Sequence, residues 1–397
     1  MKLPCGSTPL AALVLAACVA HGGSVRGGSR RTAPRTWRWT VIELESGVEA
    51  SLRGLSVVDE QVVWCGGDAG TLLRTTDGGA SWLPRPVPGA EDLDFRSVWA
   101  LDSRRAWVAS AGPGAASRIY HTGDGGESWI LQHTNEEPQG FFDAIAFWPE
   151  SGGQRGLVLG DPVGGRLTIL RTEDGGAHWE RIPADTRPEA LPGEYAFAAS
   201  GTSIALVPPS TAWIVTGGSS SRLLVSADGG LSWRARPLPL GDGSAGAGAF
   251  SVATLDGRRG LVVGGDYTQP ELAARHFART ADRGRTWDGG RAWDGGRAWD
   301  GGRTWDEGRA RGEGRTRQSQ AEVERGPAGY RSCVAAVPGS DSWIAVGTSG
   351  ADITQDGGHT WSSLGKEALN SVGLAPSGRV GFAVGPAGVV RRLEPSQ

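Results

Sequence analysis

Short apolar runs alternate with glycine-rich breaks along most of the chain. In the first stretch of this kind the runs are Leu55–Val58, Gln61–Cys65 and Thr71–Arg74, and the next stretch begins with Ser97–Leu101. Short apolar runs bounded by glycine are typical of β-strands. The pattern therefore predicts an all-β protein made of many short strands.

A polar motif follows each group of runs and occurs six times, in the form Ser/Thr-x-Asp-x-Gly-x-(Ser/Thr/His)-Trp. Its aspartates are 47, 50, 54, 54 and 74 residues apart. The aspartate accepts backbone N–H groups within its own turn, the glycine adopts positive φ at little cost, and the tryptophan starts the return strand. We interpret this motif, the Asp-box or BNR repeat, as a folding device. Its aspartates and tryptophans are Asp77, Trp82, Asp124, Trp129, Asp174, Trp179, Asp228, Trp233, Asp282, Trp287, Asp356 and Trp361.

The runs before each box and the strand that starts at its tryptophan predict a four-stranded antiparallel sheet. Such a sheet cannot bury both faces alone, so copies pack radially into a β-propeller. Three runs without a box follow the sixth copy, and Thr36–Ile42 resembles the outer strand that they lack. We therefore predict a seven-bladed β-propeller over residues 36–394, closed by an N-terminal strand that joins the last blade. Six blades are the alternative.

Residues 288–325 interrupt the pattern. Trp287, Trp293, Trp299 and Trp305 lie six residues apart in repeated Trp-Asp-Gly-Gly-Arg units, and an arginine- and glycine-rich stretch follows. A period of six matches neither helix nor strand packing. We interpret 288–325 as a low-complexity insert that replaces the outer strand of the fifth blade. Stacking of its Arg and Trp side chains on bases or sugars is the alternative.

The N-terminus has the pattern of a secretory leader. Residues 1–17 carry one early lysine and an apolar run that is too short to span a bilayer. The run ends in a small-residue pair before Cys18, which resembles a lipobox and predicts lipidation of Cys18; ordinary signal cleavage is the alternative. Residues 18–35 are predicted to be a flexible tether. We expect an exported protein, periplasmic or at the cell surface, anchored to the membrane by lipid.

The charge and amino-acid composition exclude some classes of protein. The formal charge of −3 and the pI near 6.1 argue against a sequence-independent nucleic-acid binder. Hydrophobic residues make up 39%, which is enough for a large core and excludes global disorder. Of the four cysteines, Cys65 and Cys333 fall in the folded part, and we expect both to be buried free thiols rather than a disulfide.

Polar and aromatic side chains gather in the turns that a propeller would place opposite its boxes, where the second and third strands meet and where blades connect. Proteins of this fold bind ligands around the central opening, so these residues are candidates for a binding site; the plainer interpretation is that Asp and Gly favour turns. The candidates are Asp143, Asp161, Glu194, Tyr195, Asp266, Tyr267, Tyr330 and Arg331.

No complete catalytic constellation accompanies them. The sequence has no HExxH motif and no CxxC pair for zinc, and no Gly-x-Ser-x-Gly elbow. Glycoside hydrolysis needs only two carboxylates, and Asp161, Glu194 and Asp266 leave that chemistry open. We assign no catalytic residue and expect no cofactor and no metal.

Asp-boxes also occur in sialidases, but the Arg-Ile-Pro segment expected before the first box follows the third one here, at Arg181–Pro183. The chain is more similar to the photosystem II stability/assembly factor-like BNR propellers, which include bacterial relatives labelled BNR-repeat glycosyl hydrolase or oxidoreductase. The segments that carry this resemblance are Phe142–Trp148, Gly160–Pro162, Glu194–Thr202, Val263–Tyr267 and Gly329–Ser332.

That resemblance implies a seven-bladed, non-catalytic scaffold that helps to assemble membrane complexes. We expect a protein or peptide partner in the cell envelope, such as a membrane complex under assembly. The alternative is a carbohydrate-active enzyme that binds a glycan and uses carboxylates of the central opening.

Overall fold

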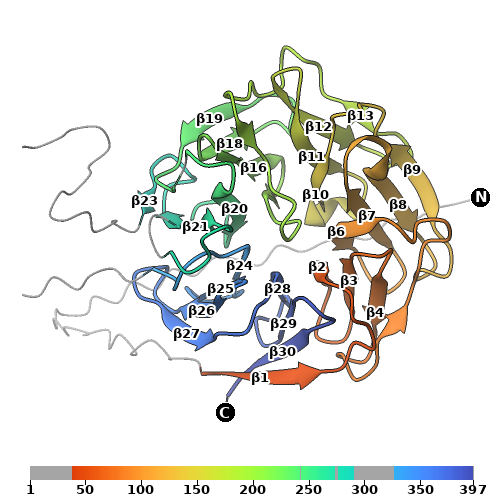
Figure 1. Cartoon of the computed structure of the whole chain (residues 1–397), viewed down its shortest axis with the longest axis vertical. Helices are drawn as coiled ribbons and strands as arrows, with labels where there is room; N and C mark the ends of the chain where they lie inside the picture. Colours follow the sequence, from red (N-terminus) through yellow and green to blue (C-terminus); the bar gives the residue numbers. More distant parts are fainter. Residues whose placement is uncertain (1–37, 242, 273–275, 290–325, 397) are drawn as a thin grey trace, which may run out of the picture. The chain divides into compact units, whose positions relative to one another are not determined.

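The computed structural model describes residues 38–241, 243–272, 276–289 and 326–396. Within them, seven antiparallel sheets are arranged as blades around a central axis (Figure 1). This arrangement confirms the predicted seven-bladed propeller and rules out six blades. The helical segments in the described residues are two short 3₁₀ turns, η1 (Gly114–Ala116) and η2 (Pro149–Ser151), and no helix there has the length and hydropathy of a membrane span.

The first four blades follow the chain from the inner strand to the outer strand. Their strands are, for blade one, β2 (Leu52–Val57), β3 (Val63–Gly67), β4 (Leu72–Thr75) and β5 (Leu83–Pro84); for blade two, β6 (Asp94–Ala100), β7 (Ala106–Ala111), β8 (Arg118–Thr122) and β9 (Ile130–Thr134); for blade three, β10 (Phe142–Phe147), β11 (Gly156–Val163), β12 (Arg166–Thr172) and β13 (Glu180–Arg181); and for blade four, β15 (Ile204–Val207), β16 (Thr211–Val215), β18 (Arg222–Ser226) and β19 (Arg234–Pro237).

Blades five and six continue the same order, and blade five gains two extra strands. Blade five comprises β20 (Ala247–Thr254), β21 (Gly260–Asp266), β22 (Phe277–Thr280) and β23 (Asp288–Gly289), extended by β14 (Glu194–Tyr195) and β17 (Gly217–Gly218); blade six comprises β24 (Cys333–Ala336), β25 (Trp343–Gly347), β26 (Gly350–Thr354) and β27 (Ser362–Gly365). The expected loss of the outer strand of blade five is wrong, because Asp288 and Gly289 pair with β22. The rest of the expected insert, 290–325, lies outside the described residues.

Both ends of the described chain build blade seven. Its strands are β28 (Ser371–Leu374), β29 (Gly381–Val384), β30 (Val390–Pro395) and β1 (Trp39–Leu44). The outer strand β1 is antiparallel to β30, from Trp39 opposite Pro395 to Leu44 opposite Val390, and the two strands lie side by side (Figure 1). The predicted closure by an N-terminal strand is confirmed; the strand runs over Trp39–Leu44, where Thr36–Ile42 was expected.

Each Asp-box is held by the same side-chain hydrogen bonds. In the first box Thr75 Oγ1 donates to Asp77 Oδ1 at 2.7 Å, and the backbone N and Oγ of Ser81 donate to the two oxygens of Asp77 at 2.9 and 2.6 Å. Equivalent bonds recur in the other five boxes. These donors lower the pKa of Asp77 to about 2.

The box tryptophans pack against the preceding blade rather than within their own sheet alone. Trp129 of the second box meets Trp64 of blade one edge-to-face, with ring centroids 6.2 Å apart. Trp82 of the first box meets Phe382 of blade seven in the same way at 6.4 Å, which closes the ring. The apolar core therefore lies between neighbouring blades. Cys65 and Cys333 are buried in it as free thiols, as predicted.

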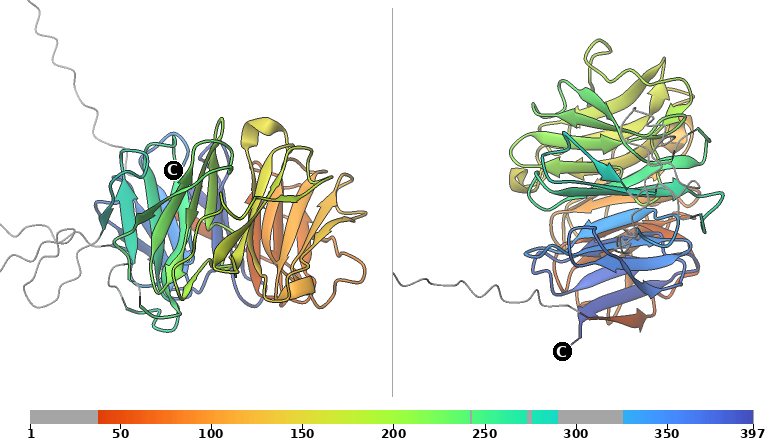
Figure 2. Two further views of the ribbon diagram at one scale, coloured as in Figure 1. Left: turned by 90° about the horizontal axis from the view of Figure 1, so that it is seen from above. Right: turned by 90° about the vertical axis from the view of Figure 1, so that its left-hand side faces the viewer.

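The strand order sets which side chains share a face. Because each strand runs opposite to its neighbour, the inner strand of a blade begins on the face that carries the turns between second and third strands. It ends on the face that carries the boxes. We call these the mouth face and the box face. Figure 2 shows the blades from the side, between the two faces.

Candidate functional site

Four inner strands carry a β-bulge near the mouth face. The bulges fall between Leu52 and Gly54 in β2, Phe95 and Ser97 in β6, Phe142 and Ala144 in β10, and Ala249 and Ser251 in β20. In each case the extra residue has no cross-strand partner. A bulge changes the direction of a side chain and commonly lies beside a functional site. The four extra residues are Arg53, Arg96, Asp143 and Phe250.

The two arginines lie on neighbouring blades and influence each other. Burial and the charge of Arg96 lower the pKa of Arg53, while Asp94 and Asp68 oppose that shift. Arg96 Nε donates to Asp94 Oδ2 at 2.6 Å. Tyr330, which leads into blade six, also faces Arg53, although blade seven lies between blades six and one. Side chains from blades one, two and six therefore lie near enough to one another at the central opening for their charges to interact.

Asp143 and Asp161 form a pair of neighbouring carboxyl groups in blade three. Asp143 is only 2% exposed, and its Oδ2 has no hydrogen-bond partner among the described residues. Burial and the nearby charge of Asp161 raise its pKa well above the ordinary value, against the opposing effect of Arg96. Asp161 is also a bulge residue, in β11; its Oδ1 accepts the backbone N–H of Ala196 at 3.1 Å, and burial raises its pKa to about 6.

An aromatic group completes the site. Phe250 stacks on Phe197 with ring centroids 3.8 Å apart, and it meets Tyr330 and Tyr267 edge-to-face at 4.9 and 6.3 Å. Tyr267 is 54% exposed, so the group presents aromatic surface to solvent. We use the name mouth cluster for the set formed by Arg53, Asp94, Arg96, Asp143, Asp161, Phe197, Phe250, Tyr267 and Tyr330.

Four candidates from the sequence thus lie in the mouth cluster, namely Asp143, Asp161, Tyr267 and Tyr330. Glu194 and Arg331 are instead buried in ion pairs. Glu194 accepts from Arg222 Nε at 2.8 Å and from Thr216 Oγ1 at 2.5 Å, and Arg331 Nε donates to Asp352 at 2.9 Å. The functional groups of Glu194 and Arg331 are therefore paired within the propeller.

The last two candidates, Asp266 and Tyr195, lie in local structure beside the cluster. The Asp266 carboxylate accepts hydrogen bonds from Thr268 N and Ser244 Oγ, both at 2.9 Å. These bonds lower the pKa of Asp266 and stabilise the turn that contains it. Tyr195 belongs to β14, where it pairs with Gly217 rather than forming the inter-blade turn expected from the sequence.

Sequence reasoning missed Arg53, Asp94, Arg96 and both phenylalanines of the cluster. The expected inner strands began at Leu55 and Ser97, and the structure extends them to Leu52 and Asp94. An arginine just before a predicted inner strand in two consecutive repeats was the available signal. No group of three or more His, Cys, Asp or Glu side chains within the described ranges is placed to hold a metal.

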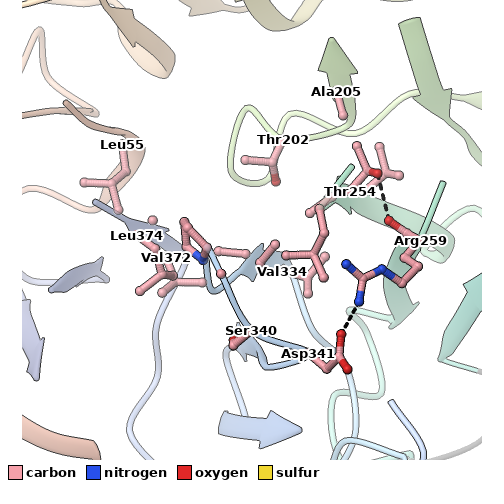
Figure 3. A pocket seen from close by; sticks show the side chains of 18 of the residues that line it. Leu55, Thr202, Ala205, Thr254, Arg259, Val334, Ser340, Asp341, Val372 and Leu374 are labelled. Carbon is pink, nitrogen blue, oxygen red and sulfur yellow. Dashed lines mark hydrogen bonds and ion pairs between the residues drawn. The ribbon is translucent and has the colours of Figure 1, made fainter. Parts of the chain in front are cut away.

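The box face carries a different hollow, shown in Figure 3. It has a volume of about 820 Å³ and is lined by the ends of five inner strands, with aliphatic side chains such as Leu55, Val334 and Val372. An ion pair between Arg259 and Asp341 borders it. Arg259 and Asp341 are the charged residues in its lining and they are paired with each other, whereas the mouth cluster brings charged and aromatic groups together.

The described residues thus form a seven-bladed Asp-box propeller with a charged and aromatic central opening. The family model described as "Photosynthesis system II assembly factor YCF48" matches residues 31–140. The chain is 36% identical over 62 residues to the chloroplastic photosystem II stability/assembly factor HCF136 of Oryza sativa subsp. japonica, covering 15% of this chain and 14% of that protein. It is 24% identical over 148 residues to the photosystem II assembly lipoprotein Ycf48 of Synechococcus sp. (strain CC9902), covering 37% and 40%. The chain thus matches about one seventh of the plant relative and two fifths of the cyanobacterial one.

Solved structures show the same fold over nearly the whole length. The structure described as "YCF48 bound to D1 peptide" has a TM-score of 0.58 at 18% identity, over 92% of this chain and 96% of that one. YCF48 from Cyanidioschyzon merolae has a TM-score of 0.56 at 17% identity, over 90% and 98%. These structures confirm the propeller fold, and the family match over residues 31–140 shows that this part of the chain is similar to the photosystem II assembly factors.

Proposed function

We propose that this protein is an exported assembly scaffold whose mouth cluster binds a segment of a partner protein. The observation that carries the proposal is the meeting of two arginines, two adjacent carboxyl groups and several aromatic rings at the central opening. Aromatic and arginine side chains are enriched among the residues that dominate protein interfaces. A peptide offers charge, backbone amides and side-chain area to such a mixed surface.

The comparisons support the same kind of role. Its relatives are named for the assembly of photosystem II, and one similar structure is described as holding a D1 peptide. We extend peptide or protein binding to this chain and propose a membrane complex under assembly as the setting. The relatives are assembly factors rather than enzymes, which favours a non-catalytic role.

The location belongs to the proposal as well. Residues 1–17 would direct export, and lipidation of Cys18 would hold the propeller at a membrane through the tether 18–35; the name of the cyanobacterial relative includes the word lipoprotein. All of these residues lie outside the described ranges. Mass spectrometry of the mature N-terminus should find an acylated Cys18. The Cys18→Ala variant should lose the acyl groups and leave the membrane fraction.

Crosslinking and affinity capture from solubilised membranes test partner binding with the full-length protein. We expect a membrane-complex subunit to be recovered, and an overlapping peptide array of that subunit to identify the bound segment. Tyr267→Ala should lose the capture, because the exposed ring is removed from the mouth cluster. Leu231→Ala is the matched control, since Leu231 is 46% exposed in a turn of the box face.

Equal capture by the wild type and Tyr267→Ala would contradict the proposed role of the mouth cluster. Hydrolysis of a glycan by the wild type, abolished in Asp161→Asn, would replace the scaffold with a carbohydrate-active enzyme. Folding of each variant is checked by circular dichroism, so that a lost interaction is not confused with a lost fold.

A further inference from the structure

The mouth cluster contains an unsatisfied acceptor that the propeller itself does not pair. Asp143 Oδ2 is buried without a hydrogen-bond partner among the described residues, in a side chain that is only 2% exposed. A buried polar atom without a partner costs free energy and is rare in folded proteins. The bulge at this position holds the carboxyl group there, so the position of this acceptor is built into β10.

The neighbouring arginine is already engaged. Arg96 faces Asp143, but its Nε donates to Asp94 Oδ2 at 2.6 Å. Asp161 faces Asp143 from the adjacent strand β11 and uses Oδ1 to accept from Ala196 at 3.1 Å. Three carboxylates (Asp94, Asp143 and Asp161) and one guanidinium group (Arg96) interact around this point, an excess of two negative charges when all are ionised.

The surroundings also offer a flat surface for a planar cation. Ala196, whose amide bonds to Asp161, is followed directly by Phe197, and Phe197 stacks on Phe250 at 3.8 Å. A guanidinium group pairs with carboxylates through its fork of N–H donors and stacks on aromatic faces. Carboxylates and an aromatic ring, the two kinds of partner that a guanidinium group prefers, are therefore both present in this part of the mouth cluster.

We propose that Asp143 and Asp161 form a subsite for the guanidinium group of one arginine side chain from the bound partner. This inference rests on the proposed function, because it names the residue that a bound segment places in the mouth cluster. The guanidinium donates to Asp143 Oδ2 and to the Asp161 carboxylate, and it balances the local excess of negative charge.

Protonation gives the subsite a distinct signature. The pKa of Asp161 is about 6 and that of Asp143 is also raised, so both carboxyl groups hold protons at acidic pH. Arg96 and Asp161 are the charged groups that face Asp143, on β6 and β11 respectively. A bound cation favours the ionised carboxylates, so binding is weak at pH 5, strengthens towards pH 8 and releases protons.

The test uses the full-length protein and two small probes, N-acetyl-arginine methylamide and its uncharged citrulline analogue, followed by calorimetry and ligand-detected NMR. At pH 8 the arginine probe should bind about tenfold or more tightly than the citrulline probe. Asp143→Asn and Asp161→Asn should each remove this preference. Glu137→Gln is the matched control, because Glu137 lies in the connection that leads into the same blade but is paired with Arg181 at 2.6 Å.

Each outcome decides the question. Equal affinity for the two probes, or an unchanged preference in both Asp143→Asn and Asp161→Asn, overturns the subsite. If the wild type still captures its membrane partner in that case, the proposed scaffold function stands without an arginine contact. If the arginine probe binds as expected but no partner is captured, the subsite stands and the scaffold function fails.

Discussion

On the box face, six hairpins repeat the same hydrogen bonds at equivalent places in successive blades. On the mouth face, the bulged positions of the inner strands carry an arginine in two blades, an aspartate in a third and a phenylalanine in a fourth. The box aspartates have their oxygens fully used, as in Asp77 and Asp228. Asp143 on the other face keeps one oxygen unpaired.

This difference reflects two requirements on the same repeated sheet, which are stable folding and ligand binding. A feature that every blade needs to fold must be the same in every blade, so it appears as a sequence repeat. A binding site needs unlike groups at one place, so it appears where equivalent positions differ. Substitutions on the box face should therefore alter stability, and substitutions in the mouth cluster should alter binding and pH dependence.

The largest effect is expected where the ring closes. Phe382 is fully buried in β29 and packs edge-to-face on Trp82 of the first box at 6.4 Å. Phe382→Ala should lower the free energy of unfolding by about 3–5 kcal/mol, because it leaves a cavity between blades seven and one. Urea denaturation followed by circular dichroism measures this change. A loss below about 1 kcal/mol would mean that the aromatic contacts between blades do not hold the ring together.

A smaller loss is expected within one box. Asp228 accepts from Ser226 Oγ at 2.7 Å and from Ser232 N and Oγ at 2.9 and 2.6 Å. Asp228→Ala should destabilise the protein by about 1–2 kcal/mol, since the turn loses its acceptor. Asp228→Asn is the control, because its amide oxygen still accepts the Ser232 N–H.

The box aspartates also predict acid sensitivity. Their hydrogen bonds lower their pKa values, so their stabilising effect is present above the ordinary aspartate pKa and is lost as pH falls below it. The wild type should lose stability between about pH 4 and pH 2, and Asp228→Asn should lose less over that interval. An equal slope for both proteins would contradict this account.

The fold was predictable because its signals are local and repeated. The Asp-turn-Trp hairpin uses bonds between residues four positions apart, as between Asp77 and Ser81, so one short motif specifies one hairpin. Counting the hairpins and the leftover strands gives seven blades. Even the closing strand was visible, because the segment near Trp39 has the form of the strand that follows a box.

The site was only partly predictable because its determinants are long-range. Glu194 and Arg331 appeared to be free polar residues in turns, but their partners Arg222 and Asp352 lie 28 and 21 residues away. Arg53 and Arg96 were missed because each inner strand extends past its apolar run towards the mouth face, and an arginine just before that run was the one local signal of the extension. The side chains that lie near one another at the opening come from blades that are distant in sequence.

On the mouth face, replacing a charge should stabilise the fold. Asp143 is a buried carboxyl group whose pKa is raised, so the folded state retains a proton that the unfolded state has already lost. Its ionisation reduces stability as pH rises above the ordinary aspartate pKa. Asp143→Asn should therefore raise the free energy of unfolding by about 1–2 kcal/mol at pH 8 and have less effect at pH 4. Thermal unfolding at both pH values measures the difference, and a loss of stability at pH 8 would contradict it.

The smallest effect is expected in the one box whose turn lacks glycine at its fourth position. Arg283 adopts φ = 67° there, while Gly229 takes the same place in blade four with φ = 77°. A side chain in the left-handed region is strained, and Arg283→Gly relieves that strain. Glycine also makes the unfolded chain more flexible, which offsets part of the gain, so the net stabilisation should be about 0.5–1 kcal/mol. The control is the reverse change, Gly229→Ala, whose added methyl group lies at an ordinary contact distance of 3.8 Å from Arg155 and Arg171, so it should cost about 1 kcal/mol through backbone strain. If both variants unfold at the wild-type denaturant concentration, the conformation of this turn does not limit the stability of the box, and the repeat owes its form to the aspartate and tryptophan alone.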